Sequence, residues 1–200
     1  ADGHHWRARS CIVLTGIGTV RTDNPRLDVR HVATPRQPRR GVIDPGLDIH
    51  ENATVLAGGD AIIFTANNDP EKIDRLSAHG ARVVLVPDAS NPPSAVRKRV
   101  DLMAMMRWLA EDDINEVHVE AGEGMNGALI AAGCVDELVL YMAPLLLGDG
   151  KGLARIPAIE RLEDAARFEF IDVARLGSDM RIRARDMTRW ADLQSKLHLG

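Results

Sequence analysis

The sequence is poor in cysteine: its 200 residues include two, Cys11 and Cys134, and both lie beside apolar neighbours. Because no C-x-x-C spacing is present, the sequence predicts no disulfide framework, and we expect two buried thiols in a protein of a reducing compartment. No apolar run approaches the roughly 20 residues that a membrane-spanning helix needs. No signal peptide is recognisable either, so we expect no membrane partner.

Excess charge of one sign is also lacking. The net charge is −4 and the isoelectric point is about 6.0, which gives no basis for nucleic-acid binding. With 45% hydrophobic and 27% charged residues, the chain has the composition of an ordinary globular domain with a real core. It opens at Ala1 without a methionine, so we expect a piece of something longer: a domain over 1–186, incomplete at its N-terminus, and a tail or terminal helix over 187–200.

Several common catalytic patterns are missing as well. The chain has no nucleophile elbow, no Walker A loop and no Ser/His/Asp arrangement. His4, His5 and Cys11 lack the spacing of metal ligands, so no metal site is predicted. His118 alternates with two valines in a strand pattern, which favours a packed histidine over a catalytic base.

What the chain does contain is a series of short apolar runs separated by helical patterns. Asp69-Pro70 is typical of a helix start, and apolar spacing predicts another helix over 102–109. Gly16 to Thr19 is interpreted as a glycine turn, and Arg181, Arg183 and Arg185 as a solvated or edge-protecting face. The predicted strands are 10–15, 40–44, 61–65, 81–86, 116–120 and 137–143, with a final hairpin of 168–173 and 180–185. This order predicts an α/β fold with a mostly parallel central sheet, helices on both faces and an antiparallel C-terminal edge hairpin.

The most specific local motif lies at Val117–Gly127, where Gly122, Gly124 and Gly127 have G-x-G-x-x-G spacing between a predicted strand and a predicted helix. Such glycines let main-chain N–H groups approach a phosphate at a helix N-terminus. A Rossmann unit would lie near the start of its domain and carry an acid about 20 residues further on, where this chain has Tyr141-Met142. We therefore interpret the motif as a phosphate-binding turn in another α/β fold.

Glu120 closes the strand before that motif. Ligands of open α/β sheets bind beyond the carboxyl ends of the strands, so a carboxylate there is suited to accept hydrogen bonds from a ligand. The alternative is an acid that caps the following helix. We favour ligand contact, because a capping residue would lie nearer the start of the helix.

A second candidate segment runs from Leu14 to Arg30 and reads LTGIGTVRTDNPRLDVR. Thr19 offers a hydroxyl group, Asp23 is suited to a ribose hydroxyl or to capping the local turn, and Arg30 offers a fork that fits phosphate. The alternative is a plain polar turn followed by a solvated arginine face. Spacing alone does not separate the two readings.

These two motifs together resemble the reductase domain of the bifunctional riboflavin biosynthesis deaminase-reductase (RibD type). The similarity extends from about Trp6 to Ile182 and includes Val42–Asp44, the Pro144–Gly148 segment and the Gly177–Asp179 turn. The resemblance implies a dihydrofolate-reductase-like fold in a cytoplasmic homodimer. It implies NADPH-dependent reduction of 5-amino-6-(5-phosphoribosylamino)uracil to the ribitylamino form, by direct hydride transfer to C1′ of the ribose.

The resemblance also assigns residues, position by position. It implies that the phosphoribosyl pyrimidine substrate contacts Arg7, Leu27, Arg30 and Glu120. It implies NADPH contacts at Thr19, Asp23, Gly122, Glu123, Gly124, Met125, Asn126, Gly127 and Ala128. No proton donor is assigned.

The chain departs from the family pattern in three ways. The usual first strand before Ala1 is missing, Pro45 replaces a common Ser or Thr, and the zinc deaminase half with its H-x-E and P-C-x-x-C signature is absent, although we expect it upstream in the full-length protein. Two other hypotheses stay open: a reductase of the same fold for a pterin or folate-like substrate, and a non-catalytic nucleotide-binding or dimerisation domain. Arg30 argues against the first, because such a substrate needs no phosphate-binding arginine.

Overall fold

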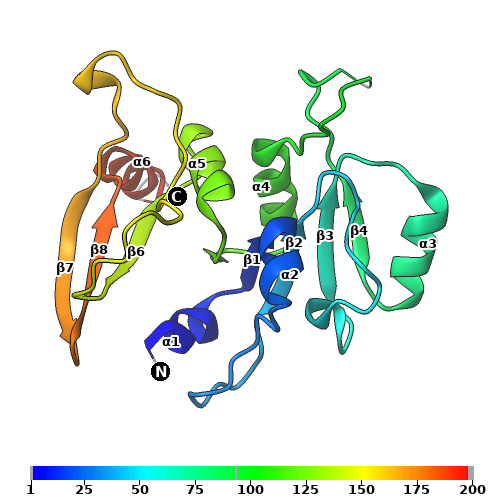
Figure 1. The fold of residues 1–200 in the computed structure, drawn as a ribbon, viewed down its shortest axis with the longest axis horizontal. Helices are drawn as coiled ribbons and strands as arrows, with labels where there is room; N and C mark the ends of the chain where they lie inside the picture. The colour runs from blue at the N-terminus through cyan, green and yellow to red at the C-terminus, as the bar shows by residue number, and fades with distance from the viewer. Residues whose placement is uncertain (1, 93, 198–200) are drawn as a thin grey trace. The chain divides into compact units, whose positions relative to one another are not determined.

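The computed structural model describes residues 2–92 and 94–197. The chain divides into two compact units, Ala1–Met125 and Asn126–Gly200, which are described separately (Figure 1). None of the helices in the described ranges is long and apolar enough to cross a membrane.

The first unit is built on a five-stranded sheet in which every neighbouring pair is parallel. The order is β4-β3-β2-β1-β5, which confirms the predicted parallel sheet. The strands are β1 (Ile12–Gly16), β2 (Arg39–Ile43), β3 (Ala61–Thr65), β4 (Arg82–Leu85) and β5 (Val117–Val119).

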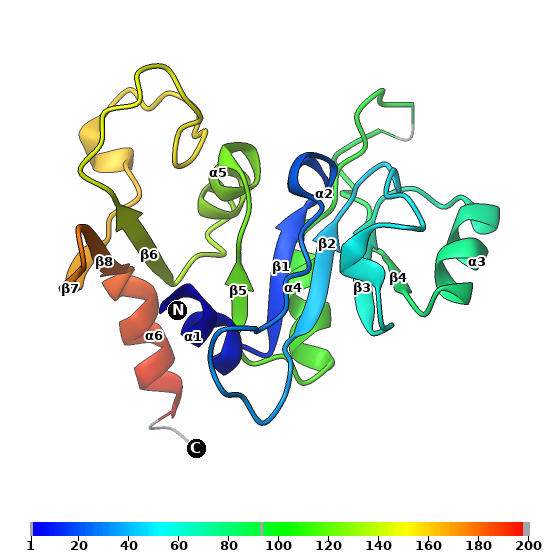
Figure 2. The ribbon, with the colours of Figure 1, turned by 60° about the horizontal axis from the view of Figure 1, so that its bottom comes forward.

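Both faces of this sheet are buried, which explains why its strands read as continuous apolar runs. Val13 contributes to one core, whereas Ile12 and Leu14 contribute to the other, since successive side chains of a strand point to opposite faces. The first core also takes side chains from α2 (Ile17–Asp23), the 3₁₀ turn η1 (Thr54–Leu56) and α3 (Pro70–Ala78), and the second takes them from α4 (Leu102–Glu111). The helices therefore lie on both faces, as predicted (Figure 2).

Local chemistry sets the ends of two of these helices. The Asp69 carboxylate accepts a hydrogen bond from Lys72 N (3.1 Å) with Pro70 in the first turn, so the predicted start of α3 is confirmed. Asp101 caps α4 in the same way through Ala104 N (2.8 Å). Gly80, with φ of 81°, follows α3 and stops it.

Two N-terminal helices differ from the prediction. Helix α1 (Asp2–Arg9) was not predicted, because it buries no residue fully and shows no apolar periodicity. The glycine turn predicted over Gly16 to Thr19 is wrong: Gly16 is extended and α2 begins at Ile17. Glycine favours turns on average, but Val20 supplies a buried contact that keeps this segment helical.

The second unit contains a three-stranded antiparallel sheet of order β6-β8-β7. Helix α5 (Glu123–Ala131) spans the division between the units, and it is followed by β6 (Glu137–Met142), η2 (Leu162–Asp164), β7 (Glu169–Leu176), β8 (Asp179–Arg185) and α6 (Met187–Leu197). The predicted hairpin is confirmed as β7-β8, and it pairs with β6 to form a separate sheet.

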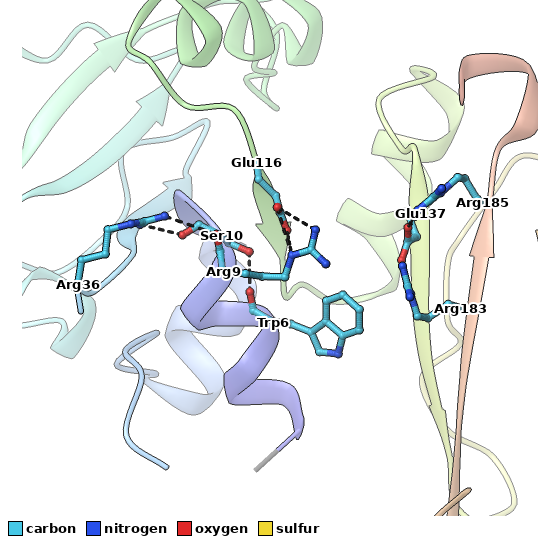
Figure 3. A network of polar contacts seen from close by, with 8 residues as sticks. All are labelled: Trp6, Arg9, Ser10, Arg36, Glu116, Glu137, Arg183 and Arg185. Carbon is cyan, nitrogen blue, oxygen red and sulfur yellow. Dashed lines mark hydrogen bonds and ion pairs between the residues drawn. The ribbon is translucent and has the colours of Figure 1, made fainter. Parts of the chain in front are cut away.

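Because β8 is the central strand, the edge-protecting role predicted for its arginines is wrong. Arg183 and Arg185 both donate to Glu137 of β6, each at 2.7 Å (Figure 3). Arg181 donates to Asp172 of β7 at 2.8 Å. Their side chains are 18–24% exposed. The period-two pattern was visible in the sequence, but the acidic partner that Arg183 and Arg185 share, 46 and 48 positions away, was not.

Candidate functional site

The first unit has a topological switch point at β1. The chain moves from β1 to β2, β3 and β4 on one side and returns as β5 on the other. Glu120 N donates to Leu14 O (2.9 Å) and Thr15 Oγ1 donates to Glu120 O (2.6 Å), so the ends of β1 and β5 are fastened together. Open α/β sheets bind ligands at such a point, beyond the carboxyl ends of the strands. Both sequence motifs therefore meet where a site is expected.

Three glycines at this edge are not required by the fold. A Cβ added at Gly18, Gly122 or Gly124 meets nothing within 4 Å, and none of the three has a positive φ. Gly18 and Gly124 lie within helices, where glycine costs about 1 kcal/mol relative to alanine. Glycine without a conformational or packing reason is typical of close approach between a main chain and a ligand. The edge therefore fits a phosphate-bearing cofactor.

Gly127 differs from these three. A Cβ there would lie 2.0 Å from the main-chain oxygen of Arg155, so glycine is needed for packing. Its neighbour Asn126 donates through Nδ2 to Leu153 O at 2.9 Å. The last part of the G-x-G-x-x-G motif thus holds the 153–155 segment against α5, an interaction that the spacing did not predict.

Arg7 and Glu120, both predicted to bind substrate, contact each other. Arg7 Nε donates to Glu120 Oε1 and Arg7 Nη2 to Glu120 Oε2, each at 2.6 Å, in a bidentate ion pair. Arg7 Nη1 also donates to Asp28 O at 2.9 Å. Arg7 therefore joins the end of β5 to the segment that carries Arg30.

The Glu120 carboxylate stays charged. Burial disfavours its charged form, but hydrogen bonds and Coulomb attraction from Arg7 and His118 outweigh burial and lower its pKa to about 2. His118 Nε2 lies 3.3 Å from Glu120 Oε1, and the His118 side chain is 22% exposed. His118 is packed as predicted, and it also supports Glu120, which sequence alternation alone did not indicate.

The segment after α2 presents arginines around Asp28. Arg26 Nε lies 3.2 Å from Asp28 Oδ2, and Arg30 Nε lies 3.3 Å from Asp28 Oδ1, with the Arg30 side chain 48% exposed. Leu27 has φ of 55° and is 2% exposed within the core. Its side chain therefore packs inward, and its main chain is the part left to meet a ligand.

The other predicted cofactor contacts are distributed over α2 and α5. Thr19 is half-buried in α2, and Asp23 is the exposed last residue of that helix. Glu123 opens α5, Met125 lies within 4 Å of a Cβ added at Gly16, and Ala128 is exposed.

Parallel strands, a switch point and uncrowded glycines define an α/β protein with a ligand site at the carboxyl ends of β1 and β5. The chain belongs to the RibD C-terminal domain family, whose profile matches residues 1–182. Its fold is the dihydrofolate-reductase-like fold of that family.

Comparison with known proteins supports this assignment to the family. The riboflavin biosynthesis protein RibD of Bacillus amyloliquefaciens is 32% identical over 188 residues, which cover 92% of this chain and 48% of that protein. The 5-amino-6-(5-phosphoribosylamino)uracil reductase of Buchnera aphidicola is 24% identical, over 90% of this chain and 89% of that protein. The solved structure of Acinetobacter baumannii RibD, form 2, superposes with a TM-score of 0.75 at 26% identity, covering 92% of this chain and 49% of that one. The chain thus spans about half the length of RibD relatives.

Proposed function

We propose that this chain is an NADPH-dependent reductase that converts 5-amino-6-(5-phosphoribosylamino)uracil to its ribitylamino form. The observation that carries the proposal is the set of glycines at positions 18, 122 and 124, which the fold itself does not need. The Buchnera relative, which has almost the same extent as this chain, bears the name of that activity. The shared family and the location of the site support the same reaction.

For the cofactor, we propose contacts from α2 and from the segment that enters α5. Gly122 and Gly124 would let main-chain N–H groups approach phosphate, with Thr19 and Asp23 on the neighbouring helix. When bound, NADPH would supply a hydride for C1′ of the ring-opened imine form of the ribosyl group, and the imine nitrogen would take up a proton to give the ribitylamino product. Asn126 and Gly127 already serve packing within the second unit, so we assign them the smaller part in cofactor binding.

For the substrate, we propose that Glu120 accepts hydrogen bonds and that Arg30 binds the 5′-phosphate. Glu120 is well suited, because Arg7 and His118 fix its carboxylate in the charged form. Arg7 then acts on the substrate mainly through Glu120, since much of its guanidinium is already engaged. Leu27 would contribute main-chain contacts. Holding the reacting carbon in one place is the main catalytic task of such a site.

The test is absorbance at 340 nm with this chain, NADPH and the phosphoribosylaminouracil substrate. We expect substrate-dependent oxidation of NADPH, slower oxidation of NADH, and none with dihydrofolate in place of the substrate. Oxidation with dihydrofolate would instead indicate the pterin or folate reductase. NADPH binding without turnover of either substrate would indicate a non-catalytic binding domain.

We also propose a homodimer. Large apolar side chains of the second unit are exposed, among them Leu146 (103%), Leu147 (86%), Leu162 (82%) and Phe170 (72%). Large exposed apolar side chains concentrated in one unit fit an association surface. In sedimentation equilibrium we expect a dimer for wild type, a monomer for Phe170→Glu, and an unchanged dimer for Leu85→Glu, a matched exposed residue of the first unit. A wild-type monomer would contradict the proposal.

Two further proposals concern the natural protein. Because RibD relatives are about twice as long as this chain, we propose that a zinc deaminase domain precedes it in the full-length polypeptide. Cys11 and Cys134 form no disulfide in the part of the chain that the structure describes, which fits the cytoplasmic location that we propose for it. An immunoblot of the source cells, with an antibody to this chain, would separate a band near twice its 21.9 kDa from one near that mass.

A further inference from the structure

Helix α1 places a histidine beside the proposed phosphate-binding arginine. His4 and Arg7 lie three positions apart, on the same side of the helix. While Arg7 contacts Glu120 and Asp28 O, His4 Nδ1 accepts a hydrogen bond from Arg30 N at 3.3 Å. One helix therefore supports both the charged group at the end of β5 and the main chain of Arg30.

The hydrogen bond to Nδ1 fixes the tautomer of His4. A neutral imidazole that accepts at Nδ1 carries its proton on Nε2, which is then a donor on the other side of the ring. The His31 ring packs against His4 at a right angle, with centroids 4.6 Å apart, and limits its rotation. Burial and the neighbouring charges of Arg7, His31 and Arg30 lower the His4 pKa, which favours this neutral form.

Within the described part of the chain, the terminal nitrogens of Arg30 and the Nε2 of His4 make no hydrogen bond to protein. Arg30 has one ion-pair contact, from Nε to Asp28 Oδ1 at 3.3 Å, and no protein acceptor lies against its two terminal nitrogens there. Among the same residues, His4 Nε2 has no hydrogen-bond partner. The residues that carry this guanidinium and this N–H are thus joined by one hydrogen bond, from the main chain of Arg30 to the His4 ring.

We infer that His4 is a further phosphate-binding residue, whose neutral Nε2–H donates to a phosphate oxygen beside Arg30. Hydrogen bonds to a charged acceptor are stronger than neutral ones, so a neutral donor next to an arginine is an effective partner for a phosphate monoester. This inference rests on the proposed function and names a residue that the sequence pattern did not assign. The competing explanation is that His4 only supports the main chain of Arg30.

The test compares substitutions of His4 on the 5′-phosphorylated substrate and on the same compound without its phosphate. His4→Asn keeps an acceptor near the position of Nδ1 and removes the distal N–H. We expect its KM for the phosphorylated substrate to rise about tenfold. Its kcat, and its KM for the dephosphorylated substrate, should stay almost unchanged. His4→Gln, which carries an N–H near the position of Nε2, should recover part of the loss.

His5→Asn is the matched control, because His5 is the exposed neighbour on α1 and should leave both KM values unchanged. If His4→Asn behaves as wild type, or affects both substrates equally, His4 is only a support and the inference is wrong. Arg30→Ala distinguishes failure of the inference about His4 from failure of the proposed function. If Arg30→Ala loses the preference for the phosphorylated substrate but His4→Asn keeps it, only the inference about His4 is wrong. If the wild-type enzyme itself shows no such preference, the proposed function is overturned as well.

Discussion

The five-stranded sheet has an amino edge, where its strands begin, and a carboxyl edge, where they end. Both edges are polar, but their polar groups are used differently. At the amino edge, Asp112 accepts from Arg39 and from Arg82 (2.8 Å), and Arg82 lies over the Trp108 ring. Arg9 pairs with Glu116 (2.9 Å) at the same edge (Figure 3). These groups find their partners within the chain, so the amino edge serves the fold.

At the carboxyl edge, the chain leaves capacity unused. Among the residues that the structure describes, Glu120 Oε1 accepts from Arg7 and His118, whereas Oε2 accepts once, from Arg7. A carboxylate has about four acceptor positions, so one remains on Oε2. The uncrowded glycines lie at the same edge. The difference teaches that charge alone does not mark a site; unused bonding capacity next to unexplained glycine does.

The largest expected effect separates Glu120 from Glu116. Glu120→Gln removes the charge that Arg7 and His118 hold in place, and we expect kcat/KM to fall by about 100-fold or more, as for misplacement of a positioning group. Glu116→Gln is the matched control, an acid four positions earlier at the amino edge, and should change kcat/KM by less than about twofold. Equal losses in steady-state assays would remove the distinction between the edges.

Acid unfolding sharpens the same comparison. The pKa of Glu120 is about 2 in the folded chain, below its ordinary value of 4.5, so its charged form stabilises the fold above pH 4.5. That contribution, of the order of 1–3 kcal/mol, is lost as the pH falls from 4.5 to 2. We expect the difference in unfolding free energy between wild type and Glu120→Gln to shrink over this range in urea titrations. A constant difference would contradict the role of the carboxylate.

Arg30 and Arg26 form the next pair. Both contact Asp28 and both are exposed, but Arg30 also receives main-chain support from His4. Arg30→Ala should raise the KM for the phosphorylated substrate about tenfold, because a hydrogen-bonded charge pair is lost. Arg26→Ala should leave that KM within about twofold. A similar rise for both variants would mean that the charge around Asp28, and not one arginine, binds the phosphate.

The sequence predicted the parts of the fold that depend on local chemistry. The apolar strands and the Asp69-Pro70 helix start follow from periodicity and capping, and these were confirmed. Helix α1 was missed, because it is stabilised by Arg7 across 113 positions of sequence. Gly127 was interpreted as a phosphate glycine, yet its constraint comes from the main chain of Arg155. Long-range pairing of this kind leaves no mark on local spacing.

The smallest effect, Gly124→Ala, tests the comparison most directly. Because nothing lies near the added methyl group and the position is helical, the substitution should stabilise the chain by about 0.5–1 kcal/mol in urea unfolding. The same methyl group should weaken NADPH binding several-fold if the main chain approaches phosphate there. Gly3→Ala in α1 is the matched control, since it is equally uncrowded and helical, and it should stabilise the chain without changing NADPH affinity. Stabilisation with unchanged affinity at position 124 would mean that this glycine serves no ligand.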